Sequence, residues 1–222
     1  MSAPLRLVIF DVDGTLVDSQ GTIVACMATA FQGCDLPAPS REAVLSIVGL
    51  SLDHAMRRLA PEQPDDRIGA LVAAYKSAFA AFRMSNTDYA PLYPGALEAV
   101  QGLAEQADLL LGIATGKSRR GLSALLETHN LTRHFITRQT ADDHPSKPHP
   151  SMIYTAMAEA GVEPVHTVMI GDTTFDMDMA RAAGVTGIGV NWGYHPADRL
   201  GADHMLEDFA DLPALLQHIW KG

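Results

Sequence analysis

The chain has little cysteine and no long apolar run. Its 222 residues include only two cysteines, Cys26 and Cys34, which do not form a CxxC pattern. No disulfide framework is therefore expected, and we predict a cytoplasmic protein. No segment approaches the roughly 20 consecutive apolar residues that span a bilayer. No charged leader with a cleavage site precedes the first apolar segment, so neither a membrane anchor nor export is expected.

Positive charge is also scarce. The 16 basic and 26 acidic residues give a net charge of −10. Nucleic acids and anionic membranes are bound by clustered lysine and arginine, so we expect neither as a partner. Nine histidines occur without HxxxH or HExxH spacing, which argues against a zinc site. Only four lysines are present: Lys76, Lys117, Lys147 and Lys221.

The order of apolar segments predicts an α/β protein with an inserted helical block. Residues 7–10 (LVIF) are apolar without polar alternation, which is typical of a strand buried on both faces of a parallel sheet. Residues 20–88 show helical spacing and no strand signal. The expected helices cover 20–33, 41–48, 52–60 and a long segment from Asp65, with Ser19, Ser40 and Ser51 as N-caps.

Beyond the proline-rich segment at 89–95, helix and strand patterns alternate. Strands are predicted at 109–114, 134–137, 167–172 and 187–190, between helices at about 95–105, 118–129, 150–160 and 174–183. This alternation predicts a doubly wound parallel sheet. We therefore expect a core domain of residues 1–18 and 89–222, and an all-helical domain of residues 19–88.

Two acidic residues follow the first predicted strand. Asp11 and Asp13 lie in DVDGT, where glycine permits a sharp turn at the carboxyl end of the strand. Two neighbouring buried carboxylates are unfavourable without a cation. Oxygen ligands of this kind suit Mg²⁺, which is commonly held by one or two carboxylates together with substrate phosphate. The sequence thus predicts a magnesium site here.

Three further segments carry residues suited to phosphate chemistry. Thr115 and Gly116 follow the second strong strand where a helix begins, which is a favourable place to bind phosphate. Lys147 lies in a loop stiffened by two prolines, where a fixed ammonium could contact phosphate. Asp172 ends another strand and Asp176 follows four residues later, so both acids can face one crevice. Ser118 is predicted to be an N-cap, whereas Lys117 could face phosphate or solvent.

These segments together resemble the haloacid dehalogenase superfamily. Asp11-Val12-Asp13-Gly14-Thr15-Leu16, Thr115, Lys147-Pro148 and Gly171-Asp172-Thr173-Thr174-Phe175-Asp176 match its four motifs in order. The resemblance implies that Asp11 is a covalent nucleophile and Asp13 a general acid/base. It also implies that Lys147 neutralises the nucleophile and phosphate, while Thr115 and Gly116 bind the phosphate. It gives Mg²⁺ as the cofactor, held by Asp11, Asp13 through its backbone carbonyl and Asp172, with Asp176 in an outer position.

The helical block resembles the cap of the first cap class, and the phosphoglycolate phosphatase-like branch is the nearest match. The implied activity is Mg²⁺-dependent hydrolysis of a small phosphorylated metabolite through an aspartyl-phosphate. A sugar-phosphate mutase shares all four motifs and stays open, as does a non-catalytic phosphate-binding regulatory module. Within this superfamily, a 2-haloacid dehalogenase activity is disfavoured, because it needs no acid two residues after the nucleophile, where Asp13 lies. A phosphonatase activity is disfavoured because it needs a lysine early in the cap, and residues 20–75 contain none.

The sequence leaves several features open. The identity of the phosphomonoester, the cap residues that determine specificity and the oligomeric state are not predicted. Trp192-Gly193-Tyr194-His195 could line the mouth of the crevice or pack in the core.

Overall fold

A six-stranded parallel sheet forms the centre of the molecule. The structure, a computed structural model, describes residues 4–85 and 89–221. The strands are β1 (Arg6–Phe10), β2 (Leu109–Thr115), β3 (Thr137–Thr140), β4 (Thr167–Gly171), β5 (Thr186–Val190) and β6 (His204–Leu206). They lie in the order β3-β2-β1-β4-β5-β6, and each neighbouring pair is parallel. The chain thus winds outward from β1 in both directions, which confirms the predicted fold class.

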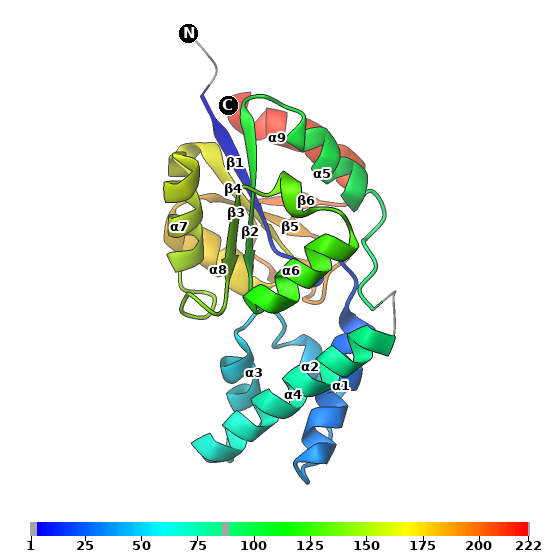
Figure 1. Cartoon of the computed structure of the whole chain (residues 1–222). Coiled ribbons are helices and arrows are strands. Elements are labelled where there is room, and N and C mark those ends of the chain that lie inside the picture. Colours follow the sequence, from blue (N-terminus) through cyan, green and yellow to red (C-terminus); the bar gives the residue numbers. More distant parts are fainter. Residues whose placement is uncertain (1–3, 86–88, 222) are drawn as a thin grey trace.

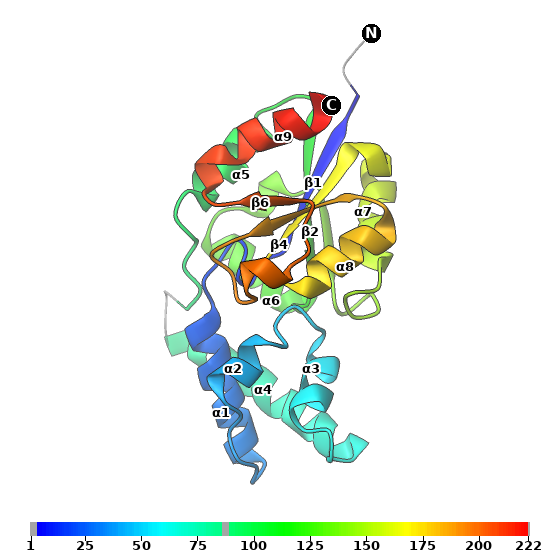
Figure 2. The same cartoon turned by 180° about the vertical axis from the view of Figure 1, so that it is seen from behind.

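Helices cover both faces of the sheet because successive side chains of each strand point to opposite faces. Val8 and Phe10 of β1 belong to one apolar cluster, with α5 (Ala96–Ala104), α6 (Arg119–Thr128) and α9 (Leu212–Lys221). Leu7 and Ile9 belong to another, with α7 (Ser151–Ala160) and α8 (Thr174–Ala183). Figures 1 and 2 show these layers from opposite sides. Four 3₁₀ turns complete the described part of the core: η1 (Thr132–His134), η2 (Pro164–His166), η3 (Ala197–Arg199) and η4 (Phe209–Asp211).

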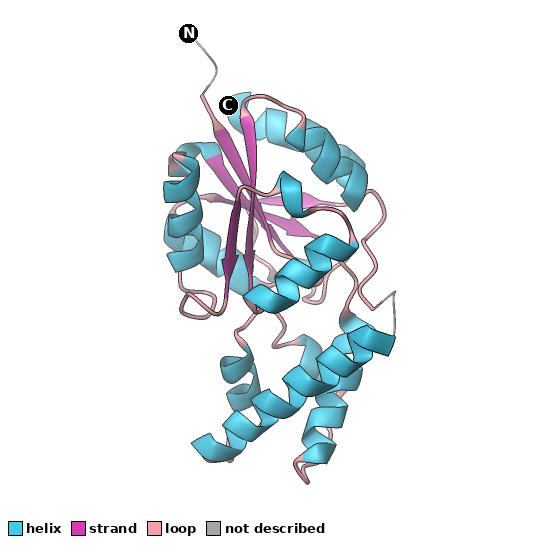
Figure 3. Cartoon of the chain, in the orientation of Figure 1, coloured by secondary structure: helices cyan, strands magenta, loops and turns pink. Residues whose placement is uncertain are grey.

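Between β1 and α5, the described residues form helices joined by loops and no strand (Figure 3). The helical block contains α1 (Gln20–Gly33), α2 (Arg41–Leu45), α3 (Leu52–Leu59) and α4 (Asp65–Ser85). Its apolar side chains, among them Met27, Val44, Met56 and Leu71, form a cluster of their own. In Figure 1 the block lies beyond the carboxyl ends of the strands, where a crevice forms in sheets of this topology. The expected domain boundary after residue 88 lies outside the described residues.

Some predicted elements were misplaced. The predicted strand at 134–137 is wrong, because residues 132–134 form η1 and β3 begins at Thr137. Phe135 is buried in the core while Ile136 is 52% exposed, so this apolar pair marks the entry to an edge strand rather than the strand itself. The second helix ends at Leu45 instead of residue 48, although Ser40 caps it by accepting from the Ala43 amide. β6 and α9 were not predicted.

Candidate active site

The site is assembled at the carboxyl ends of three adjacent strands. Phe10, the last residue of β1, pairs with Ile113 of β2 on one side and Ile170 of β4 on the other. The residues that follow in these three strands therefore meet at one edge of the sheet. They include Asp11 and Asp13 after β1, Thr115 at the end of β2, and Asp172 after β4.

Three carboxylates cluster there. Asp11, Asp172 and Asp176 are at most 1% exposed, and each offers an oxygen within 4.8 Å of the others. The Lys147 ammonium lies 3.0 Å from Asp11 Oδ1 and 2.6 Å from Asp176 Oδ1. Within the described chain, no donor meets either Asp11 oxygen in hydrogen-bonding geometry, so the ion pair with Lys147 is the contact that offsets its charge.

Burial and mutual repulsion raise the pKa values of these acids. Burial, opposed by the Lys147 charge and reinforced by Asp176 and Asp13, raises the pKa of Asp11 from its usual 3.8 to about 7. Burial and the charges of Asp176 and Asp11 raise the pKa of Asp172 well above its ordinary value. Burial opposes the charge of Lys147, but Asp11 and Asp176 outweigh it and raise the pKa of the ammonium. The cluster is therefore deficient in positive charge.

Asp172 is fixed by segments distant in the sequence. Thr15 Oγ1 donates to Asp172 Oδ1 at 3.0 Å, and the Tyr194 amide donates to Asp172 Oδ2 at 2.9 Å. A Cβ atom at Gly14, whose φ is +84°, or at Gly193 would lie 2.1 Å from Asp172 atoms. Both glycines are thus required for the close approach to this carboxylate. The backbone of Gly193 and Tyr194 therefore contacts the site, whereas the Trp192 ring packs against Tyr93 and Phe209 in the core, so each alternative holds for part of this segment.

Asp176 has a double structural role. Its carboxylate accepts from the Thr173 amide at 3.0 Å, and the Thr173 hydroxyl in turn accepts from the Asp176 amide, which forms a capping box at the start of α8. Its other oxygen binds Lys147. The helix terminus therefore orients Asp176, and Asp176 orients Lys147.

Asp13 faces a different set of groups from the carboxylate cluster. The Lys117 ammonium lies 2.7 Å and 2.8 Å from its two oxygens, and the Ser19 hydroxyl donates to Oδ1. The Ser19 amide donates to the Tyr194 hydroxyl at 3.0 Å. The prediction that Ser19 caps α1 is wrong, because its hydroxyl is directed to Asp13 and makes no cap hydrogen bond. Lys117, left open between phosphate and solvent, contacts Asp13.

Thr115 and Gly116 lie beside these carboxylates. Thr115 is buried, and its hydroxyl accepts from the Lys117 amide at 3.3 Å. A Cβ at Gly116 would come within 2.6 Å of the carbonyl oxygens of Gly49 and Leu50, so the loop after α2 packs directly on this glycine. As predicted, the Ser118 hydroxyl caps α6 by accepting from the Gly121 amide at 3.2 Å.

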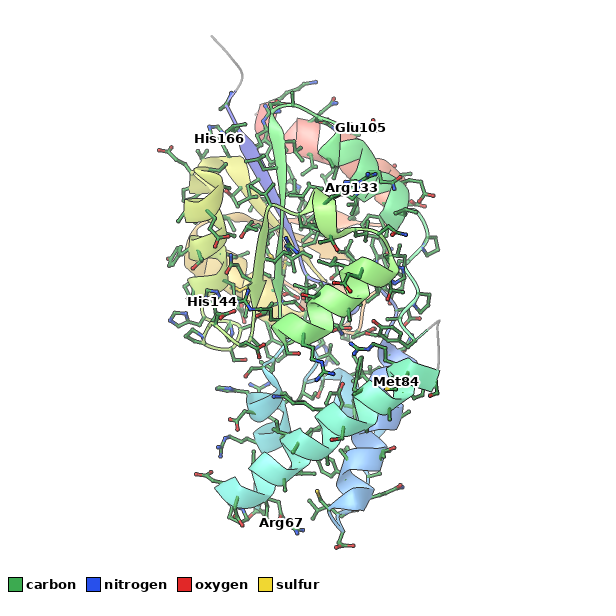
Figure 4. The ribbon with its side chains drawn as sticks, in the orientation of Figure 1. Arg67, Met84, Glu105, Arg133, His144 and His166 are labelled. Atoms are coloured by element: carbon green, nitrogen blue, oxygen red, sulfur yellow. The ribbon has the colours of Figure 1, made fainter. Side chains whose placement is uncertain are left out.

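A cavity of about 560 Å³ lies between the ends of the strands and the helical block, and Asp11, Asp13, Thr115, Gly116 and Lys117 line it on the core side. On the block side its lining combines apolar groups of α1 and α4, such as Met27 and Phe79, with the loop at 47–51 and the charged side chains of Lys76 and Arg83. Figure 4 shows the two remote ends of the molecule: Glu105 and His166 lie at the end of the core away from the block, and Arg67 lies at the far end of the block. The cavity therefore lies between the two parts of the chain, away from both of these ends.

The family follows from comparison with known proteins. Residues 8–190 match the family described as haloacid dehalogenase-like hydrolase. The chain belongs to this family. The match contains all the residues of the carboxylate cluster together with Lys147, Thr115 and the helical block.

Individual relatives of this haloacid dehalogenase-like hydrolase agree with the family assignment. The protein named probable phosphatase IndB from Dickeya dadantii (strain 3937) is 40% identical over 201 residues, which cover 88% of this chain and 85% of that protein. A phosphoglycolate phosphatase from Chromobacterium violaceum is 32% identical over 219 residues, covering 96% and 97% of the two chains. A hydrolase from Pseudomonas syringae of known crystal structure has a TM-score of 0.84 at 27% identity, covering 96% of this chain and 99% of that one. The expected resemblance to phosphoglycolate phosphatases is confirmed.

The cluster in this haloacid dehalogenase-like hydrolase has the chemistry of a divalent-cation site. Asp11, Asp172 and Asp176 supply only oxygen donors, and the Asp11 oxygens lack hydrogen-bond partners among the described residues. A hard cation would offset the excess negative charge that raises the pKa values of Asp11 and Asp172. The described residues contain no helix that is long and apolar enough to cross a membrane.

The raised pKa of Asp11 predicts a pH-dependent stability. Because this pKa is about 7 in the folded chain and 3.8 normally, the folded state binds more protons than the unfolded state between these values. The contribution of Asp11 to the free energy of unfolding therefore falls as pH rises through this range. Without metal, we expect a lower melting temperature at about pH 8 than at about pH 5.

Added Mg²⁺ is expected to oppose this trend, because a divalent cation would bind the ionised carboxylates. The increase in melting temperature on adding Mg²⁺ should thus be larger at about pH 8. Scanning calorimetry with and without Mg²⁺ tests this, and a larger increase at the lower pH would contradict it.

Proposed function

We propose that the chain is a Mg²⁺-dependent phosphatase that hydrolyses a small phosphomonoester through an aspartyl-phosphate on Asp11. The observation that supports this most directly is the Asp11 carboxylate itself. It is buried, lines the cavity, and has the Lys147 ammonium 3.0 Å from its Oδ1. Its Oδ2 has no hydrogen-bond partner among the described residues and retains its lone pairs for attack on phosphorus.

The surrounding residues would share the work of phosphoryl transfer. Thr115 and the Gly116 amide would bind the phosphate oxygens, which orients the ester for in-line displacement of its alcohol by Asp11. Lys147 is already paired with Asp11, so it would offset charge as the phosphoryl group arrives. Asp13 would donate a proton to the leaving alcohol and then accept one from the water that hydrolyses the aspartyl-phosphate.

Mg²⁺ would be held by the side chains of Asp11 and Asp172 and by the backbone carbonyl of Asp13, with Asp176 as an outer partner. When bound, it would neutralise negative charge on the phosphate and the carboxylates. Asp176 contacts Lys147 and the Thr173 amide, which supports an orienting role in place of a direct one.

The substrate is proposed to be phosphoglycolate-like, since several relatives are named phosphoglycolate phosphatase. Residues 19–88 would act as a cap that covers the ester and excludes water. A sugar-phosphate mutase and a non-catalytic phosphate-binding module are the alternatives. The mutase would return the phosphoryl group to a second hydroxyl of its sugar, whereas the module would bind phosphate without turnover.

The deciding experiment is release of inorganic phosphate from p-nitrophenyl phosphate, phosphoglycolate and a panel of phosphorylated metabolites, with and without Mg²⁺. Mg²⁺-dependent release from at least one alkyl ester supports the phosphatase. Isomerisation of a hexose phosphate at a rate far above hydrolysis would favour the mutase. Phosphate binding with no turnover of any ester would favour the module.

Asp172→Asn should weaken Mg²⁺ binding and activity together. The substitution keeps the size of the side chain, which matters because Gly14 and Gly193 lie against it, but removes its charge. Loss of outer partners of a metal ligand lowers affinity by 10–100-fold, so loss of a proposed direct ligand should lower it by at least about 100-fold. Asp178→Asn is a matched control, because Asp178 lies exposed on α8 and pairs with Arg181. Equal Mg²⁺ dependence of Asp172→Asn and wild type would remove Asp172 from the metal site.

A further inference from the structure

Lys117 has a set of contacts that the proposed roles leave unexplained. Its ammonium lies 2.7 Å and 2.8 Å from the two oxygens of Asp13, and the Lys117 and Asp13 side chains are 9% and 12% exposed. Contact with both oxygens restricts rotation of the carboxylate, because turning it would break one of the two bonds. The Ser19 hydroxyl, which donates to Oδ1, provides a third contact. Asp13 is therefore held in one orientation.

The same ammonium also contacts the helical block. Lys117 Nζ lies 5.3 Å from the centre of the Phe79 ring of α4, within the range of a cation–π interaction. Phe79 in turn packs on Tyr75 at 5.9 Å and on Tyr89 at 6.0 Å between ring centres. The ring is thus fixed among aromatic neighbours, and its distance from Lys117 depends on where α4 lies relative to the sheet.

We infer that Lys117 is a positioning residue that holds the Asp13 carboxylate for proton transfer and makes its placement depend on contact with Phe79 of α4. This inference rests on the proposed function, because it assumes that Asp13 transfers protons. The residue itself need not touch the substrate. When α4 lies in the position seen here, Phe79 confines the ammonium next to Asp13. When α4 moves away, the ammonium loses the aromatic face and the carboxylate is held less firmly.

The alternative role for Lys117 is direct contact with the substrate phosphate, since it follows Thr115 and Gly116. The two roles differ in what they affect. A phosphate contact acts on every ester and on inorganic phosphate, because all of them carry the same group. A positioning role acts only where Asp13 must move a proton, so it depends on the leaving group.

The test compares Lys117→Ala with wild type on an alkyl phosphate and on p-nitrophenyl phosphate. Removal of Asp13 itself is expected to lower turnover of the alkyl ester by about 10²–10⁴-fold, and loss of its positioning should lower kcat by about 10–100-fold. The pre-steady-state burst of p-nitrophenol should stay within about threefold of wild type, because p-nitrophenolate needs little protonation to leave. Inhibition by inorganic phosphate should be unchanged. Lys117→Arg, which retains a charged donor, should recover part of the alkyl kcat.

Other results would overturn the inference. An equal fall in the burst rate and in alkyl kcat, with weaker inhibition by phosphate, would assign Lys117 to phosphate binding. Unchanged kinetics for both esters would make the contact an ion pair without function. If wild type shows Mg²⁺-dependent turnover, the proposed function stands whatever Lys117→Ala does. If wild type turns over no ester, the proposed function is contradicted, and the inference about Lys117, which rests on it, is contradicted as well.

Dependence on α4 is tested with Phe79→Leu, which removes the ring but keeps an apolar side chain. It should lower alkyl kcat by about 3–10-fold with little change in the burst. Combined with Lys117→Ala it should add nothing further, because both changes remove the same support of Asp13. Ser77→Ala changes an exposed residue of the same helix that does not line the cavity, and it should leave the ratio of alkyl to aryl rates unchanged. Additive effects of Phe79→Leu and Lys117→Ala would contradict the dependence on α4.

Discussion

Asp11→Asn is expected to abolish phosphate release from every phosphomonoester, including those with activated leaving groups. An amide is a poor nucleophile towards phosphorus, so no phosphoryl group can be transferred to this position. We expect turnover to fall at least about 10⁴-fold, measured as phosphate release at saturating Mg²⁺ and substrate. Residual activity close to that of wild type with p-nitrophenyl phosphate would exclude Asp11 as the nucleophile.

The stability of Asp11→Asn provides its control. Since the Asp11 charge is buried among other carboxylates and its pKa is raised to about 7, removing that charge relieves repulsion in the metal-free protein. At about pH 8 without Mg²⁺, the variant should melt at a temperature equal to or above that of wild type. An inactive variant that meets this condition is folded, so its inactivity results from loss of the nucleophile and not from unfolding.

Asp13→Asn is expected to produce a loss that depends on the leaving group. For an alkyl phosphate, both the departure of the alcohol and the hydrolysis of the aspartyl-phosphate should slow, with a fall in kcat of about 10²–10⁴-fold. For p-nitrophenyl phosphate, the first step needs little proton transfer while the second still does. Rapid-quench kinetics should therefore show a burst of p-nitrophenol followed by slow turnover.

Two results would contradict this assignment of Asp13. A burst from Asp11→Asn and none from Asp13→Asn would mean that the nucleophile and the acid/base are exchanged. A loss of Mg²⁺ affinity in Asp13→Asn would mean that its side chain binds the metal, although the structure directs that side chain to Lys117 and Ser19.

The sequence predicted correctly those elements whose structure depends on residues close together in the chain. The run LVIF predicted β1 because unbroken apolar character is required of a strand covered on both faces, and Val8 and Ile9 indeed face opposite clusters. Asp11 and Asp172 were correctly predicted to lie close together, because both follow the carboxyl ends of parallel strands and these ends lie on the same side of the sheet. β3 was misplaced because its residues, TRQT, have the polar composition of an edge strand.

Contacts between distant segments were not predicted. Nothing in Gly193 and Tyr194 indicates that they pack against Asp172, because that contact depends on how the chain turns after β5. The orientation of Lys117 towards Asp13 depends on side-chain rotamers and on Phe79, which lies 38 residues earlier in the sequence. The one local clue was the position of Lys117 directly after the proposed phosphate-binding residues.

The central claim is that the phosphoryl group passes through Asp11, and it can be tested on the protein directly. Wild type would be mixed with Mg²⁺ and p-nitrophenyl phosphate, quenched in acid within the burst phase, digested and mapped by mass spectrometry, with Asp13→Asn used in parallel to accumulate the intermediate. We predict one phosphoryl group per chain, located on Asp11 in the peptide that contains the end of β1. Release of phosphate without any phosphorylated peptide, or a phosphoryl group on another residue, would contradict the proposed mechanism.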